Sequence, residues 1–120
     1  VLAALDGKIH SFQHNNNLGD YGPTIILEHK INIYQFYTLY GHLALESIEN
    51  LKKGQVVSKG EQIAILGDAN VNGDYAAHLH FQIIIDMEGK FGDYPGVCSE
   101  KTLSFYKENC PDPNWLLKIK

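Results

Sequence analysis

The chain has 120 residues, of which 44% are hydrophobic and 20% charged, so that its length and composition are typical of one globular domain rather than a disordered chain. The formal net charge of −4 argues against a nucleic-acid binder, and no apolar run approaches the ~18 residues that a membrane-spanning helix requires. We therefore expect no nucleic acid and no membrane among its partners.

β-prone runs alternate with turn signals along most of the chain. We expect strands over residues 1–5, 8–12, 24–29, 33–43 and 83–85, and two very short strands within 51–67, where glycines recur at intervals of six and seven. Polar turns separate them at Asp6-Gly7, 14–20, Asn32 and Asn72-Gly73. Helical character is limited to one turn within 45–51 and a short helix across 102–108.

This pattern predicts an all-β fold, an antiparallel β-sandwich or half-barrel. The predicted single domain has a core over residues 1–86 and a mostly irregular C-terminal tail over 87–120. The chain begins at Val1 without an initiator methionine, and we expect it to be a piece of a longer protein.

The stretch Ala77-His78-Leu79-His80-Phe81-Gln82 runs into three isoleucines and reads as the start of a buried strand. Residues two apart on a strand face the same side, about 7 Å from each other. His78 and His80 are thus placed to share a metal ion and its bound water. The alternative is an ordinary pair of solvent-facing polar positions.

His42 follows Gly41 at the end of another expected strand, where functional side chains are common. A catalytic zinc site normally has three protein ligands and an open position for water, and His42, His78 and His80 could form such a set. The residues alone do not say which of them holds metal, and spacing does not select a carboxylate. The other histidines, His10, His14 and His29, are expected at surface or hydrogen-bonded polar positions.

Cys98 and Cys110 are too far apart in the sequence for a zinc knuckle. A disulfide between them and two free thiols are both open alternatives.

Five motifs, in this order and spacing, resemble the lysostaphin/LytM-type zinc endopeptidases over residues 1–86. The motifs are Asp6-Gly7-Lys8-Ile9, Tyr21-Gly22-x-x-Ile25-Ile26-Leu27-x-His29, Tyr37-x-x-Tyr40-Gly41-His42-Leu43, Gly54-Gln55-x-Val57-x-x-Gly60-x-x-Ile63-Ala64-x-x-Gly67 and His78-Leu79-His80-Phe81. The resemblance implies the antiparallel fold called the duplicated hybrid motif. It also implies a groove that takes a peptide or peptidoglycan-like ligand.

The same resemblance assigns roles to the three histidines. It implies that His80 is a zinc ligand and that His42 and His78 are catalytic residues, which handle the attacking water and the oxyanion. The reaction implied is hydrolysis of a peptide bond in peptidoglycan by zinc-activated water.

One element of the family pattern is missing. Family members carry a His-x-x-x-Asp motif, shortly before the segment that matches Val1 to Gly7, which supplies the other two zinc ligands. No His-x-x-x-Asp occurs in this chain. A lone imidazole binds zinc weakly, so we expect the chain as given, truncated at its N-terminus, to hydrolyse nothing. The alternative is a non-catalytic binding or regulatory module of a larger multidomain protein.

The tail is similar to a version of this domain that lies between a kinase-like domain and a class III aminotransferase domain. That likeness implies flanking domains as partners and a cytoplasmic location, whereas the peptidases proper imply the cell envelope. A swinging-arm carrier of the lipoyl or biotinyl kind is a third interpretation, suggested by the glycine spacing of residues 54–67. It is disfavoured because no Met-Lys or Asp-Lys hairpin tip is present to carry the cofactor.

Overall fold

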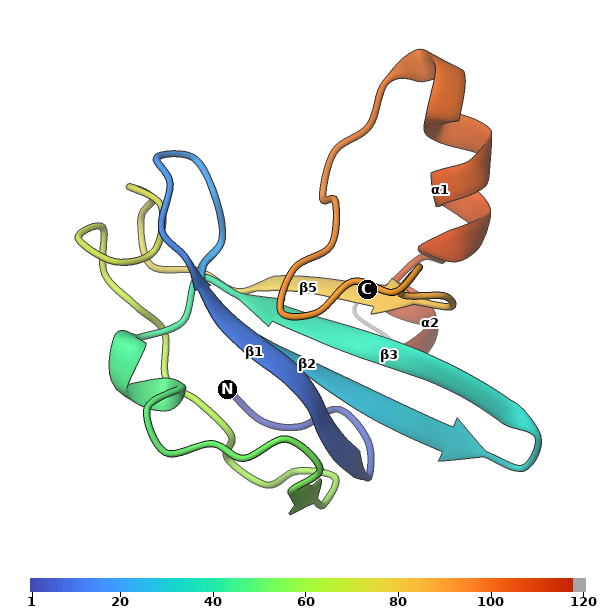
Figure 1. The fold of residues 1–120 in the computed structure, drawn as a ribbon, viewed down its shortest axis with the longest axis horizontal. Coiled ribbons are helices and arrows are strands. Elements are labelled where there is room, and N and C mark those ends of the chain that lie inside the picture. The colour runs from blue at the N-terminus through green and yellow to red at the C-terminus, as the bar shows by residue number, and fades with distance from the viewer. Residues whose placement is uncertain (118–120) are drawn as a thin grey trace.

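A single antiparallel sheet forms the centre of the molecule in the computed structural model, which describes residues 1–117 (Figure 1). Its strands are β1 (Gly7–Asn15), β2 (Gly22–Ile31), β3 (Tyr34–Gly41), β4 (Val56–Val57) and β5 (His80–Ile84). They lie in the order β4-β1-β2-β3-β5, so the sheet is open and β4 and β5 are its edges. The prediction of an all-β fold is confirmed.

Alternate residues of the central strands are buried on opposite faces of the sheet. Ile25 and Leu27 of β2 belong to one hydrophobic cluster, and Ile26 between them belongs to another. The same alternation puts Tyr40 of β3 in the first cluster and Leu39 in the second. Both faces of the sheet are therefore covered.

The first face is covered by the N-terminal segment and by the connection between β3 and β5. That connection contains one 3-10 turn, η1 (Leu45–Ser47), within the range where a helical turn is predicted. The buried members of this first core are Ala3, Ile9, Ile25, Leu27, Tyr40, Leu43, Val57 and Ala64.

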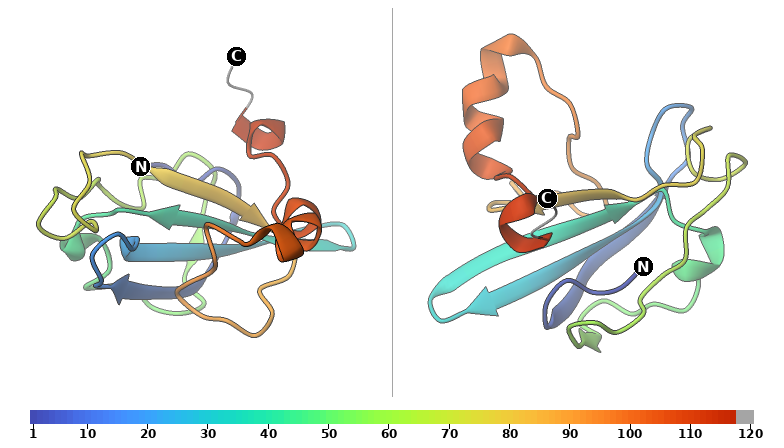
Figure 2. Two further views of the ribbon diagram at one scale, coloured as in Figure 1. Left: turned by 90° about the horizontal axis from the view of Figure 1, so that it is seen from above. Right: turned by 180° about the vertical axis from the view of Figure 1, so that it is seen from behind.

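The second face is covered by the tail. After β5 the chain crosses this face and continues into η2 (Glu100–Thr102), α1 (Leu103–Asn109) and α2 (Asn114–Leu117), which lie near β5 (Figure 2). The buried members of the second core are Tyr21, Ile26, Leu39, Ile84, Met87 and Tyr94. Tyr106 of α1 packs against them, and α1 confirms the short helix predicted across 102–108.

Hydrogen bonds attach the start of the tail to β1. The Asn15 side chain donates to the Gly92 carbonyl (2.9 Å), and the Gly92 N–H donates to the Ser11 hydroxyl (2.7 Å). Farther along, the Ile85 N–H donates to the carbonyl of Asn109 at the end of α1 (2.8 Å). Both ends of the crossing are thus anchored to the sheet.

The predicted strand over residues 1–5 is wrong. Only Leu2 pairs, in an isolated bridge with Gln62, and Ala3 is buried in the first core. The apolar character of this segment therefore reflects packing against the sheet rather than membership of it.

The two short strands predicted within 51–67 reduce to one, β4, together with isolated bridges. Gly54 and Gly60 both adopt left-handed backbone angles, with φ of 85° and 81°, and turn the chain before a longer strand can form. Residues 14 and 15, predicted in a polar loop, extend β1 instead. No helix within residues 1–117 combines the length and apolar character needed to cross a membrane.

Candidate functional site

The three histidines singled out from the sequence meet at one end of the sheet. Gly41, the last residue of β3, pairs with His80, the first residue of β5, and His42 follows directly. The ring centroids of His42 and His78 are 4.4 Å apart, and those of His42 and His80 are 6.0 Å apart. His78 is not on the strand as predicted, because β5 begins at His80, but its ring still reaches the cluster.

His42 has an unusual backbone conformation. Its φ is 62°, in the left-handed region that residues other than glycine seldom adopt. Its N–H donates to the Tyr21 carbonyl (2.7 Å), and its carbonyl accepts from the Gly67 N–H (3.0 Å). Two neighbouring segments therefore hold His42 in a strained geometry, and such strain is common at functional sites.

The rings of His42 and His78 share one tautomer. His42 Nδ1 lies 2.6 Å from the Asn72 carbonyl oxygen, and His78 Nδ1 lies 2.7 Å from that of Ala76. A carbonyl oxygen can only accept, so each Nδ1 carries the proton. Each Nε2 of the neutral rings keeps a lone pair that can accept a hydrogen bond or a proton.

His80 has the opposite tautomer. Its Nε2 lies 3.0 Å from Gln82 Oε1, which can only accept, and the amide orientation follows because Gln82 Nε2 donates to the Pro95 carbonyl (3.0 Å). The proton is therefore on Nε2 of His80. The lone pair on Nδ1 remains free.

His42 is held neutral by its surroundings. Burial lowers the pKa of His42, the hydrogen bond to Asn72 opposes this shift, and the nearby rings of His78 and His80 add to it. A neutral imidazole with a free lone pair suits a general base or a hydrogen-bond acceptor.

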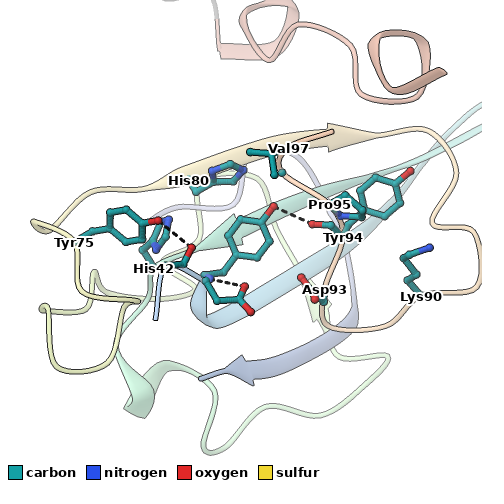
Figure 3. Close-up of a pocket in the computed structure, with 12 residues that line it drawn as sticks. His42, Tyr75, His80, Lys90, Asp93, Tyr94, Pro95 and Val97 are labelled. Atoms are coloured by element: carbon teal, nitrogen blue, oxygen red, sulfur yellow. Dashed lines mark hydrogen bonds between the residues drawn. The ribbon is translucent and has the colours of Figure 1, made fainter. Parts of the chain in front are cut away.

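A cleft of about 380 Å³ opens beside the rings of His42 and His80, and His78 lies next to His42 outside its lining. Figure 3 shows His42 and Tyr75 together at one side, and Asp93, Tyr94 and Pro95 of the tail at the other. We call residues 93–97, which form this second wall, the tail strap. The full lining is Gly19, Asp20, Tyr21, His42, Tyr75, His80, Lys90, Asp93, Tyr94, Pro95, Gly96 and Val97.

The model of peptidase family M23 matches residues 1–91 of the 120-residue chain. This chain belongs to peptidase family M23. None of the curated proteins matches the chain significantly. The resemblance drawn from the five motifs is thus confirmed at the level of the family, and the family match ends before the tail strap.

M23 peptidases are generally zinc-dependent, so the donor atoms of this chain must be compared with what zinc requires. His80 offers a free Nδ1 whose ring is oriented by a hydrogen bond on the other nitrogen, as in many metal-binding histidines. Within residues 1–117, however, no three histidine, cysteine, aspartate or glutamate side chains are arranged to hold one metal ion. The residues described do not make up a complete zinc site.

Four residues of this M23 site were not assigned to it from the sequence. Tyr75 packs on both His42 and His78. The Asn72 carbonyl accepts a hydrogen bond from His42, and the Gln82 side chain accepts one from His80. The ring centroids of Tyr21 and His80 are 4.8 Å apart. Asn72 was noted only as part of the Asn-Gly turn, and Tyr21 and Gln82 were noted within sequence motifs but were given no role in the site.

The remaining histidines and the cysteines lie outside the cleft lining, as the sequence interpretation of His10, His14 and His29 implies. His29 is buried, with its ring nitrogens bonded to the Asp6 carbonyl (2.8 Å) and the Thr38 hydroxyl (2.7 Å). Both cysteines are free thiols in this structure.

Proposed function

We propose that this M23 domain binds an extended peptide of the peptidoglycan type in the cleft beside His42, His78 and His80. We further propose that these histidines are the histidine side of a zinc peptidase site, with His80 as the metal ligand and His42 and His78 as the catalytic residues. The 120-residue chain by itself does not hydrolyse the peptide, because residues 1–117 do not bring three metal-binding side chains together around one ion.

The main support for this proposal is the tautomer of each of the three rings. His42 and His78 keep lone pairs on Nε2, and His80 keeps one on Nδ1, so each ring has one acceptor atom that receives no hydrogen bond from residues 1–117. At His42 and His78 that atom can accept a hydrogen bond from a peptide N–H or a proton from a bound water. The backbone carbonyls of Asn72 and Ala76 hold the two rings in this state.

Pentaglycine tests the proposal, with binding measured by isothermal titration calorimetry and cleavage measured by mass spectrometry. The expected result is binding without cleavage, and weaker binding in His42→Ala. His10→Ala is the matched control, because His10 does not line the cleft. Metal-dependent cleavage by the wild-type chain, or equal binding by the two variants, would contradict the proposal.

A non-catalytic regulatory module of a larger multidomain protein is the second candidate. The tail strap favours it, because residues beyond the family match form one wall of the cleft. Flanking domains of the same polypeptide would then be the partners. This candidate predicts that His80→Ala leaves binding to such a domain unchanged in a pull-down, whereas the first candidate predicts that His80→Ala weakens pentaglycine binding.

A further inference from the structure

Gln82 makes hydrogen bonds to three separate parts of the chain. Its Oε1 accepts from His80 Nε2 (3.0 Å), and its Nε2 lies 3.0 Å from the Pro95 carbonyl and 3.1 Å from the Cys110 sulfur. The side-chain amide therefore uses one acceptor site and both donor hydrogens. It joins the first residue of β5 to the tail strap and to the residue that follows α1.

The tail strap is attached to the cleft by a second hydrogen bond. The Tyr21 hydroxyl donates to the Tyr94 carbonyl (2.9 Å), next to the Pro95 carbonyl that Gln82 holds. Burial, followed by the charges of nearby carboxylates, raises the pKa of Tyr21 above its ordinary value, so this hydroxyl remains a donor. Two successive carbonyls of the strap are thus bound by the side chains of Tyr21 and Gln82.

The strap also lies close to the His80 ring, in the same cleft lining. A Cβ atom placed on Gly96 would come within 3.4 Å of His80 Cε1 and would overlap the Tyr21 hydroxyl. The ring of His80 therefore lies between Tyr21, the backbone of Gly96 and the amide of Gln82.

We propose that Gln82 is a positioning residue of this site, which holds His80 in the tautomer with a free Nδ1 and which the tail strap holds in turn. The inference rests on the proposed function for the role of Nδ1, but the hydrogen bonds themselves do not depend on it.

Two substitutions separate the two tasks of Gln82. Gln82→Ala removes the acceptor for His80 and both donors. Gln82→Glu keeps an acceptor for His80 but cannot donate to the Pro95 carbonyl. Gln62→Ala is the matched control, because Gln62 is exposed and lies outside the cleft lining.

The measurement is the tautomer of each ring from the ¹⁵N chemical shifts of its nitrogens, at about pH 8, well above the ordinary histidine pKa of about 6.5. In the wild-type chain and in Gln82→Glu, His80 is expected to carry its proton on Nε2. In Gln82→Ala it becomes a mixture of both tautomers. His42 and His78 are internal controls, since backbone carbonyls keep their protons on Nδ1 in every variant.

Pentaglycine affinity is the second readout, and Gln82→Ala is expected to weaken it about tenfold, the effect of losing one hydrogen bond. A His80 ring that keeps its proton on Nε2 in Gln82→Ala would overturn the inference, as would a tautomer mixture in Gln82→Glu. Failure of the wild-type chain to bind pentaglycine would instead count against the proposed function. The tautomer result would still decide the role of Gln82.

Discussion

The rings of His42 and His78 lie with centroids 4.4 Å apart, and each donates its Nδ1 proton to a backbone carbonyl. The neighbouring ring of His78 disfavours a positive charge on His42, since like charges repel. Their proximity adds to the burial that lowers the pKa of His42. The two rings therefore lie side by side at the end of the sheet with their Nε2 atoms not bonded to the backbone carbonyls.

The stability of the protein is expected to fall as the pH is lowered from about 7 to about 5. Burial lowers the pKa of His10, His29 and His42, so the unfolded chain takes up protons at a higher pH than the folded protein does. Protonation then favours unfolding. The raised pKa of Asp93, caused first by burial, has the opposite effect at lower pH. Urea midpoints at several pH values measure the slope, and a constant midpoint would contradict the expectation.

His29→Gln tests whether His29 contributes to this pH dependence of stability. Glutamine does not titrate, and its amide can still bond to the groups that the buried His29 ring reaches. The variant is expected to show a weaker pH dependence of the urea midpoint than the wild-type protein. An unchanged slope would show that the other histidines account for it.

Tyr21→Phe is expected to destabilise the protein by about 1–2 kcal/mol, because the Tyr94 carbonyl loses its donor in a buried position. Urea denaturation gives the free energy of unfolding. Tyr34→Phe is the matched control, since the Tyr34 side chain is 68% exposed. Equal losses in the two variants would mean that the bond to the strap contributes little.

Gly96→Ala is expected to displace the tail strap from the cleft and to cost about 1–3 kcal/mol, because the new methyl group would overlap the Tyr21 hydroxyl. Hydrogen exchange of the amides in residues 93–97 reports the displacement, as faster exchange. Val97→Ala in the same strap is the control, because Val97 is 90% exposed. Unchanged exchange in Gly96→Ala would contradict this expectation, because it would show that the methyl group fits without displacing the strap.

His42→Asn and His42→Val separate the ring of His42 from its backbone. Asparagine tolerates the left-handed conformation at φ 62°, whereas a β-branched residue does not. We expect His42→Val to be less stable than His42→Asn by about 1–2 kcal/mol in urea denaturation. Both variants should bind pentaglycine more weakly than the wild-type chain. Equal stability of the two would indicate that the backbone relaxes at this position.

The strands of the sheet could be predicted because buried strands are rich in β-branched and apolar residues, which can be recognised in the sequence. Residues 24–27 are β-branched or apolar without a break, as a strand covered on both faces should be. The same criterion failed for residues 1–5, since an apolar segment can pack onto a sheet without joining it. His78 shows a related error, because the strand was predicted to include His78, whereas β5 begins two residues later at His80.

The histidines of the site could be found because they belong to short motifs. The residues that hold them in place could not be found. Gln82 meets Pro95 and Cys110 only after the tail has crossed the sheet, and Tyr21 meets Tyr94 across 73 positions of the sequence. Contacts of this kind leave no periodic pattern in a single sequence. The left-handed backbone of His42 likewise depends on bonds to the distant residues Tyr21 and Gly67.

The second core has a practical consequence for shortening this protein. The family match ends at residue 91, yet Tyr94 is almost fully buried against the sheet, and Tyr106 packs on the same cluster. A version cut at residue 91 would leave the face around Ile26, Leu39 and Ile84 bare to water. Exposed apolar area of this kind promotes aggregation. Any fragment prepared for crystallisation or display should therefore extend past Cys110.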